Sequence, residues 1–429
     1  MSTTFSALSV RNYRVYAWGA LLSNIGTWLQ NTAQTWLVLQ LTGSGSAVGF
    51  AIAMQMLPSL LFSPVAGVLA DRFSKRTLMS WLQLGMAVPS GALGVLALSG
   101  QVQLWHVYVL AFVFGTARAF EAPARQSFVA DMVGADQLSN AVALNSASFN
   151  SGRLIGPAIA GLMIGALGSG VEATGYVIAG NAVSYGFVLL ALRLIDPSLL
   201  HASSVGRRGR GAVREGVAYV RSRPDLLLLL GCVFFLGAFG LNFQITTALM
   251  ATEVFDRGAS EFGILGSFVA IGSLAGSLLA ARRPRPRLRF VVGAGLAFCV
   301  VQFSSGLMPN YVAYAFIMPF LGLTVLTTVT TANALIQLTS APTMRGRVAA
   351  LYLMVFLGST PMGAPFIGWI AELYGPRFAL MLSGILAGAG IAGCAIWFIR
   401  QDSHAMARLR ERRRRGAVVR TGDSGPFIG

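Results

Sequence analysis

Three ionisable side chains lie inside apolar runs of the 429-residue sequence, where a carboxylate can bind and release a proton away from bulk water. Arg118 and Glu121 are three residues apart, so an α-helix would place both on one face. Arg153 is the third such charge. An ionised group at mid-membrane costs on the order of 2.5–3.5 kcal/mol, which pairing or a watery cavity can offset. We therefore interpret Glu121 as a proton carrier, with Arg118 and Arg153 completing a proton-coupling group.

A structural ion cluster is the alternative interpretation of these charges. Arg153 can pair with Glu121 across the interface of two predicted helices. Positive neighbours favour the ionised form of a carboxylate, whereas a carrier must also take up a proton. The sequence leaves both interpretations open, and proton coupling is the preferred one.

A stripe of small residues occupies the next apolar run. Gly152, Gly156 and Ala160 recur at four-residue spacing, and such a stripe lets a facing helix approach closely. Pro157 adds a kink, and Gly161 extends the small surface. The segment is either a generic packing face or a specialised helix contact.

A short charged segment separates two apolar runs of membrane length. Residues 67–76 read Gly-Val-Leu-Ala-Asp-Arg-Phe-Ser-Lys-Arg, which is typical of a tight turn at a membrane surface. Gly67 allows two helices to approach, and the carboxylate of Asp71 can accept hydrogen bonds from a helix N-terminus. Arg72 and Lys75 favour the cytoplasmic side of a bilayer.

The composition indicates which elements hold these residues. Hydrophobic residues make up 55% of the chain and charged residues only 11%, whereas a soluble domain has about 25% charged residues. Lipid must therefore surround the chain, and the expected fold class is an all-α membrane protein. Twelve apolar segments of spanning length are predicted, over residues 15–41, 47–70, 77–99, 104–124, 141–167, 174–195, 226–251, 261–281, 289–308, 310–337, 347–373 and 377–399.

Basic residues are distributed unequally about these segments. Nearly all of the 32 Lys and Arg residues fall on the side of the N-terminus, whereas Arg257 and Arg377 fall on the other side. Because basic loops stay in the cytoplasm, both termini are predicted to be cytoplasmic. Topology then explains the net charge of +17, and we expect the basic tail around residues 408–415 to contact anionic lipid rather than nucleic acid.

Residues 196–225 form the longest polar interruption and divide the chain. The predicted parts are a six-helix bundle over 1–195, a cytoplasmic linker over 196–225, a second six-helix bundle over 226–400 and a basic cytoplasmic tail over 401–429. Within the linker, Val213, Val217 and Val220 share one face of a short helix, which we expect to lie on the membrane surface.

The two predicted bundles resemble internal repeats. Three glycines in each half match at a constant offset of 207 residues. The matched pairs are Gly156 with Gly363, Gly161 with Gly368, and Gly168 with Gly375.

Enzyme chemistry has no clear signature in this sequence. The three cysteines, Cys232, Cys299 and Cys394, each lie in an apolar run without metal-ligand spacing. The sequence has no nucleotide-binding P-loop and no evident nucleophile–base pair. We therefore expect no enzyme activity, no catalytic residues, no metal and no cofactor.

Taken together, these motifs resemble the major facilitator superfamily of membrane transporters. Residues 67–76 resemble its loop signature G-x-x-x-D-R-x-x-[RK]-[RK], and Arg118 matches a signature arginine on the fourth helix. Residues 152–161 are similar to the antiporter signature G-x-x-x-G-P-x-x-G-G of drug exporters, with Ala160 in place of one glycine. The resemblance implies twelve transmembrane helices in two six-helix pseudo-repeats.

Further segments resemble the enterobactin-exporter-like branch of this superfamily, which also contains multidrug efflux proteins. They are residues 123–127, 141–146, 149–157 and 219–224. Members of the branch are proton-driven exporters, so the resemblance implies a multi-pass protein of the bacterial inner membrane. Exporters of siderophores and of drugs share these motifs, which leaves the substrate open.

The resemblance also implies roles for single residues. The predicted conformational latch consists of Gly67, Asp71, Arg72, Lys75 and Asp131. Within it, Asp71 would cap the start of the predicted helix 347–373 and Lys75 would pair with Asp131. The antiporter motif would seal the pathway against an inward leak, as the corresponding helix does in the family; its residues are Gly152, Gly156, Pro157 and Gly161.

By analogy with the family, the helices over 15–41, 226–251 and 310–337 line the substrate cavity. Neutral hydrogen-bonding groups mixed with aromatic rings suit a bulky amphipathic molecule. The predicted cavity residues are Asn24, Trp28, Gln30, Asn31, Gln34, Phe239, Asn242, Gln244, Thr327 and Thr331. For each single residue, hydrogen bonding between helices is an equally good interpretation.

The preferred function is proton-coupled export, or antiport, of a bulky amphipathic organic molecule such as a drug or siderophore by alternating access. One alternative is an uncoupled facilitator or lipid translocase. Another is a membrane sensor that retains the fold without moving a substrate. The expected partners are the small-molecule substrate, protons and membrane lipids, and we expect a monomer.

Overall fold

Helices make up the regular structure of the described chain. The computed structural model describes residues 3–201, 212–282 and 286–421, without the side chains of residues 3–4, 63–72, 135, 212–213, 281 and 402–421. The elements are η1 (Thr3–Ser9), α1 (Arg11–Thr42), α2 (Gly45–Arg72), α3 (Lys75–Leu98), α4 (Leu104–Ala166), α5 (Val171–Leu194), η2 (Pro197–Leu199), α6 (Ala212–Arg221), α7 (Pro224–Phe235), η3 (Leu236–Gly240), α8 (Phe243–Leu249), η4 (Met250–Val254), α9 (Ala259–Ala281), α10 (Leu288–Gly306), α11 (Tyr311–Thr339), α12 (Arg345–Tyr374) and α13 (Pro376–Thr421).

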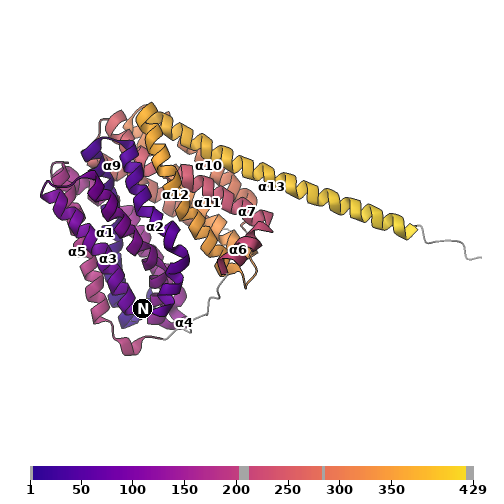
Figure 1. Cartoon of the computed structure of the whole chain (residues 1–429), viewed down its shortest axis with the longest axis horizontal. Coiled ribbons are helices and arrows are strands. Elements are labelled where there is room, and N and C mark those ends of the chain that lie inside the picture. The colour runs from indigo at the N-terminus through magenta and orange to yellow at the C-terminus, as the bar shows by residue number, and fades with distance from the viewer. Residues whose placement is uncertain (1–2, 202–211, 283–285, 422–429) are drawn as a thin grey trace, which may run out of the picture.

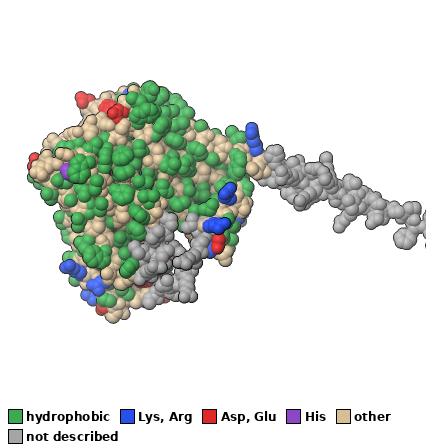
Figure 2. Space-filling model, viewed as in Figure 1, with side chains coloured by type: hydrophobic (Ala, Val, Ile, Leu, Met, Phe, Trp, Pro, Cys, Tyr) green, Lys and Arg blue, Asp and Glu red, His purple; other side chains and the backbone are tan. Residues whose placement is uncertain are grey.

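Ten stretches of helix in the described chain are long and apolar enough to cross a membrane. Two further segments of spanning length pack among them, namely α1, which is rich in amide and hydroxyl side chains, and residues 135–166 of α4. Figure 2 shows hydrophobic side chains spread over the flank of the molecule, as lipid contact requires. The chain is therefore an all-helical membrane protein.

Glycine 134 divides α4 into two helices. The sequence predicts spans over 104–124 and 141–167 with a polar interruption between them. The structure continues both helices up to Gly134, whose φ of 69° lies in the left-handed region that favours glycine. The predicted spans 104–124 and 141–167 are therefore too short, because the first helix extends beyond residue 124 and the second begins before residue 141.

The predicted helix over 226–251 is interrupted rather than continuous. After α7 the chain forms the π-helical turn η3, a break at Leu241 and Asn242, the short helix α8 and a second π-helical turn, η4. Turns of this type leave carbonyl groups without their usual helical partners and occur often at functional sites.

The helices pack as two groups. Helices α1–α5 contact one another and form the N-bundle, and α7–α13 contact one another and form the C-bundle. In Figure 1 the indigo and purple N-bundle lies on the left and the orange C-bundle on the right. We call the end of the molecule with Gly43, Ser169 and Glu372 the Gly43 end, and the opposite end, with Lys75 and Asp131, the Lys75 end.

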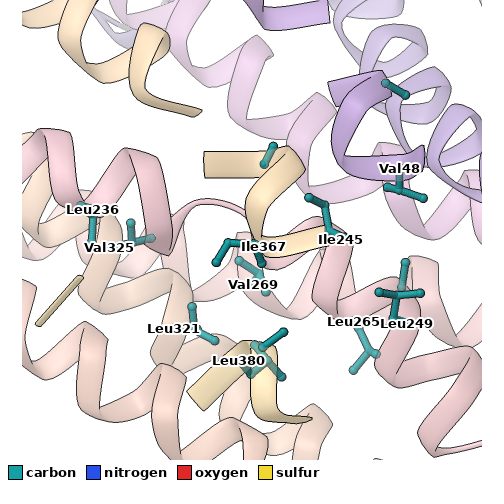
Figure 3. Packing of buried hydrophobic residues seen from close by; sticks show 14 of the residues in the cluster. Val48, Leu236, Ile245, Leu249, Leu265, Val269, Leu321, Val325, Ile367 and Leu380 are labelled. Carbon is teal, nitrogen blue, oxygen red and sulfur yellow. The ribbon is translucent and has the colours of Figure 1, made fainter. Parts of the chain in front are cut away.

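A shared hydrophobic core joins the bundles at the Gly43 end. The largest cluster of buried residues contains Trp36 and Val48 of the N-bundle together with Ile245 and Ile367 of the C-bundle. Figure 3 shows part of it, with side chains from α2, α8, α9, α11, α12 and α13 meeting in one core. The described members of a second cluster, which includes Phe128 near the Lys75 end, all come from the N-terminal half. The bundles are thus joined tightly at one end.

The linker helix α6 packs against the start of α12. Glu215 forms an ion pair with Arg347, and a side chain at Gly216 would touch Arg347 and Leu351. Val220 is buried, whereas Val217 is 38% exposed. The helix is therefore held by the C-bundle through Val220 and Glu215. The expected membrane contacts of Val213 and of the tail around residues 408–415 fall on side chains outside the described residues.

Candidate functional site

Glycines bring the two bundles into backbone contact at the Gly43 end. On α2, a Cβ atom added at Gly45 would lie 2.9 Å from the carbonyl oxygen of Gly368 on α12, and one added at Gly49 would overlap the carbonyl of Ala364. A larger residue at either position would force the helices apart. The α2–α12 seam is therefore a close, glycine-dependent contact between the bundles.

A second seam joins α4 to α9. A Cβ atom added at Gly161 would lie 2.9 Å from the Cα of Gly263, and one added at Gly266 would lie 3.0 Å from the Cβ of Pro157. The hydroxyl of Ser260 donates to the carbonyl of Gly161 at 3.3 Å. This contact also brings the N-bundle and the C-bundle together near the Gly43 end.

The residues predicted as an antiporter motif face two different partners. Gly152 and Gly156 pack on α1 inside the N-bundle, where a Cβ atom added at Gly156 would lie 2.7 Å from that of Trp28. Pro157 and Gly161 face α9 in the C-bundle. One end of the motif therefore fixes α4 to α1, and the other end forms the seam between the bundles.

The carboxylate of Glu372 on α12 accepts hydrogen bonds from the first residues of α2. Glu372 accepts hydrogen bonds from the hydroxyl of Ser44 at 2.7 Å, the hydroxyl of Ser46 at 2.5 Å and the backbone N–H of Ser46 at 3.3 Å. Ser44 is the N-cap of α2, so the carboxylate lies at the positive end of the helix dipole. Sequence reasoning missed Glu372, because an acid at the end of an apolar run does not indicate its partner.

An amide relay connects α1 with α2 and α8. Gln244 donates to the carbonyl of Asn31 at 3.3 Å and to the hydroxyl of Thr35 at 3.1 Å. Gln55 donates to the side chain of Asn31 at 3.1 Å. Two predicted cavity residues, Asn31 and Gln244, therefore meet across the bundle interface, together with Thr35 of the same predicted cavity helix. Gln55 was not predicted as a site residue.

Other predicted cavity residues form hydrogen bonds within the N-bundle. Gln30 accepts a hydrogen bond of 2.5 Å from Asn181, and Asn24 donates one of 2.8 Å to Ser148. Both residues are buried. These bonds favour the alternative interpretation of Gln30 and Asn24, in which they hold α1 against α5 and α4.

The remaining predicted cavity residues also bond or pack locally. Thr327 and Thr331 donate to carbonyls of their own helix, and Asn242 donates to the carbonyl four residues before it. Phe239 stacks on a neighbouring phenylalanine, and Gln34 is only 4% exposed. None of these described contacts joins one of the five residues to another.

The predicted proton-coupling residues have a further ionisable neighbour, Arg125, which the sequence analysis did not include. Glu121 is 8% exposed, and its Oε1 lies 3.4 Å from the Nε of Arg125, which follows it by four residues on α4. Arg118 lies one turn earlier on the same helix. Sequence reasoning missed Arg125 as a site residue, although a spacing of four residues on a helix indicates an ion pair.

The predicted pairing of Arg153 with Glu121 is wrong. The guanidinium carbon of Arg153 lies 5.6 Å from the ring centre of Trp28 on α1, which is a cation–π contact. Helix packing turns the Arg153 side chain toward α1, and Arg125 takes the place beside Glu121.

A cavity of about 40 Å³ lies beside these charges, between α1, α3, α4 and α5. Its lining includes Trp28, Gln83, Arg118, Glu121, Arg125 and Tyr185. The phenol of Tyr185 lies 3.0 Å from the hydroxyl of Thr27 and accepts a hydrogen bond from Asn181 at 3.2 Å. Such a site can hold water or a small ion next to a carboxylate, which is the arrangement that proton exchange requires.

The Lys75 end contains one pair of the predicted latch. The Nζ of Lys75 lies 2.7 Å from the Oδ2 of Asp131, as the resemblance implied. Both residues belong to the N-bundle, so this pair joins α3 to α4 and not one bundle to the other. Gly67, Asp71 and Arg72 belong to the stretch whose side chains lie outside the described residues.

In the described part of the chain, no group of three His, Cys, Asp or Glu residues could hold a metal ion.

The chain matches, over residues 2–421, the protein family described as transmembrane secretion effector. It is 28% identical to the multidrug efflux pump Tap of Mycolicibacterium fortuitum, over 86% of this chain and 92% of that protein. It is 23% identical to the staphyloferrin A transporter of Staphylococcus aureus, over 84% of this chain and 90% of that protein.

Solved structures show the same architecture. The crystal structure of the nucleoside transporter NupG superimposes with a TM-score of 0.72 at 12% identity, covering 90% of this chain and 98% of that one. At this identity the similarity concerns the fold alone. It identifies the fold of the two bundles as that of the major facilitator superfamily.

Proposed function

The chain belongs to the transmembrane secretion effector family of major facilitator transporters, and we propose that it exports a bulky amphipathic organic molecule in exchange for protons. Export proceeds by alternating access, in which the two bundles seal one end of the pathway and then the other. The protein is a membrane transporter and not an enzyme.

The seal at the Gly43 end is the observation that supports this proposal best. Two glycine-dependent seams, α2–α12 and α4–α9, hold the bundles together there. The buried residues shared between the bundles belong to the same cluster. A transporter at rest needs one closed end of this kind, and the seams supply it with contacts that a small rotation of one bundle can break.

Basic residues support an orientation for this seal. Lys75 and Arg76 lie at the Lys75 end, which we place on the cytoplasmic side by the positive-inside rule, together with both termini. The Gly43 end then faces outward. In this orientation the structure corresponds to a state that is closed to the outside.

Glu121 is the proposed proton carrier. It is a buried carboxylate beside a small polar cavity, and Arg125 is its only ion-pair partner among the described residues. A proton moving inward across a membrane releases about 2.3 kcal/mol per 100 mV. Protonation of Glu121 would break its pair with Arg125 and thereby link proton uptake to the packing of α4.

The relatives support the proposed class of substrate. One is a multidrug efflux pump and another is a staphyloferrin A transporter. We therefore propose that the substrate is a drug-like or siderophore-like molecule. It would enter from the Lys75 end and form hydrogen bonds with the amide side chains of Gln55, Asn31 and Gln244.

Transport in proteoliposomes tests this function. Purified protein is reconstituted, a pH gradient is imposed, and accumulation of a panel of drugs and siderophores is measured with and without an uncoupler. Glu121→Gln should lower coupled transport about tenfold or more. Glu172→Gln, which changes an exposed acid on α5, is the matched control and should leave transport unchanged.

Two results would contradict the proposal. Transport that is insensitive to the uncoupler and normal in Glu121→Gln would favour an uncoupled facilitator or lipid translocase. A well-folded protein that moves none of the compounds and no protons would favour a sensor.

A further inference from the structure

Three buried polar atoms, on residues that line the cavity of the N-bundle, have no hydrogen-bond or ion-pair partner among the described residues. They are Nε1 of Trp28, Oε1 of Gln83 and Nη1 of Arg118. Buried polar groups in folded proteins are nearly always paired, so each unpaired atom needs an explanation. Three such atoms on residues around one cavity indicate a single cause.

The charge at this cavity is unbalanced. Arg118 and Arg125 line it, and Glu121 is the single carboxylate among its described lining residues. Arg153 adds a further cation nearby, 5.6 Å from the ring centre of Trp28. A buried cation without a counter-charge is costly, and one carboxylate balances only one of these three guanidinium groups.

The unpaired donors at the cavity also outnumber the unpaired acceptors. Trp28 and Arg118 each carry an unpaired N–H, whereas Gln83 supplies the single unpaired acceptor among the described lining residues. Gln83 is 3% exposed, and rotation of its amide by half a turn would present an N–H instead. A water molecule accepts only about two hydrogen bonds, but an anion can accept from all of these groups.

We propose that this cavity binds one small monovalent anion of about the size of chloride, held by the N–H groups of Trp28, Arg118 and Gln83, with Arg125 as a further cation beside it. A volume of about 40 Å³ has room for an ion of this size. The same chemistry would accept a single carboxylate group. The bound anion would balance the positive charge of the arginines that Glu121 does not neutralise.

This site has a consequence for Glu121. An anion beside Arg118 and Arg125 would compete with the Glu121 carboxylate for Arg125, and it would therefore weaken the ion pair that proton uptake by Glu121 has to break. That consequence rests on the proposed function. Anion binding itself does not, and it can be measured on protein at rest, without transport.

Bromide quenching of tryptophan fluorescence tests the site, because the indole of Trp28 lines the cavity. Purified protein in detergent is titrated with bromide at constant ionic strength, with gluconate as the replacement anion. We expect a saturable component with a Kd on the order of 10 mM, which chloride displaces. Trp28→Phe should remove this component, whereas Trp105→Phe, at a residue that is 57% exposed, should leave it unchanged.

A second pair of variants does not depend on Trp28. Gln83→Leu should raise the Kd for bromide about fivefold or more. Gln137→Leu removes an equally unpaired amide oxygen that does not line the cavity and should leave the Kd unchanged. Displacement by acetate would extend the site to carboxylates, and failure of acetate to displace bromide would restrict it to halides.

Two outcomes would overturn the proposal. One is the absence of any saturable bromide component in protein that elutes as a single species. The other is a saturable component that persists in both Trp28→Phe and Gln83→Leu, which would place the anion elsewhere on this basic protein. Neither outcome bears on whether the protein exports its substrate.

Discussion

Glu372, near the end of α12, accepts a hydrogen bond of 2.7 Å from the hydroxyl of Ser44, the residue that caps α2. The two residues are 328 positions apart in the chain and belong to different bundles. Their contact lies beside the α2–α12 seam, where Gly45 meets Gly368. The carboxylate of Glu372 therefore adds a polar contact between the bundles at the Gly43 end, beside the close helix contact that the glycines allow.

Loss of this carboxylate should favour opening at the Gly43 end. Glu372→Ala removes three hydrogen bonds from the start of α2, which in this exposed position are together worth about 1 kcal/mol. We expect about a fivefold increase in the open population. Pulsed electron–electron resonance between spin labels at Gln101 and Leu307, both exposed at this end, measures it.

Glu253→Ala is the matched control for this experiment. Glu253 is an exposed acid at the same end of the molecule, and its replacement should leave the label distances unchanged. Equal effects of the two substitutions would show that general charge, and not the Ser44 contact, holds this end closed.

The α4–α9 seam should not tolerate side chains. Gly161→Val places atoms where the Cα of Gly263 lies, 2.9 Å from the new Cβ, and such overpacking costs about 1–3 kcal/mol. The closed state should lose this energy, so a leak of protons through proteoliposomes should rise. Gly180→Val, at a glycine with open space around it, is the control. A tight membrane with the Gly161 variant would exclude the seam as a seal.

Arg125 should stabilise the N-bundle through Glu121. Arg125→Gln leaves a buried carboxylate without its partner and should lower the melting temperature in detergent more than the double variant Glu121→Gln/Arg125→Gln does. The coupling energy from the double-mutant cycle should be about 1 kcal/mol or more. The same cycle between Arg153 and Glu121 should give a smaller value, because Arg153 faces Trp28. A larger coupling for Arg153 would contradict the observed arrangement.

Loss of the Lys75 side chain should lower the stability of the N-bundle without opening the contact between the bundles at the Gly43 end. Lys75→Met removes a partly buried ion pair with Asp131 inside the N-bundle, worth about 1 kcal/mol. Thermal unfolding should therefore shift to lower temperature while the distance between labels at Gln101 and Leu307 stays as in the parent protein. A change in that distance would show that the pair communicates with the other bundle.

Several features of the site were readable from the sequence. Glu121 and Arg118 stand out because an ionisable group in an apolar run is rare, and Gly161 and Pro157 because small residues recur at helical spacing. The predicted pair of Lys75 and Asp131 is present. The roles assigned to these residues in coupling, latching and sealing stay predictions, as do the boundaries of the four predicted parts of the chain.

Other features could not be predicted because they depend on how each helix is rotated about its axis. Spacing alone allowed Glu121 to pair with Arg153, but packing placed Arg125 beside it. Gly152 and Gly161 belong to one motif, yet they face helices of different bundles. Most predicted cavity residues proved to be hydrogen-bonded inside their own bundle.

By itself, the sequence determined that this chain spans a membrane as a set of helices and belongs among transporters. The membrane-spanning helices follow from local composition, because the transfer of each apolar stretch into lipid depends on its own residues. The transporter class follows from the resemblance of short motifs, which are also local in the chain. Only the tertiary structure decided which groups touch: Glu372 with Ser44, Gly161 with Gly263, and unpaired donors around one cavity. Such contacts join residues far apart in the chain, and the packing of whole helices fixes their distances.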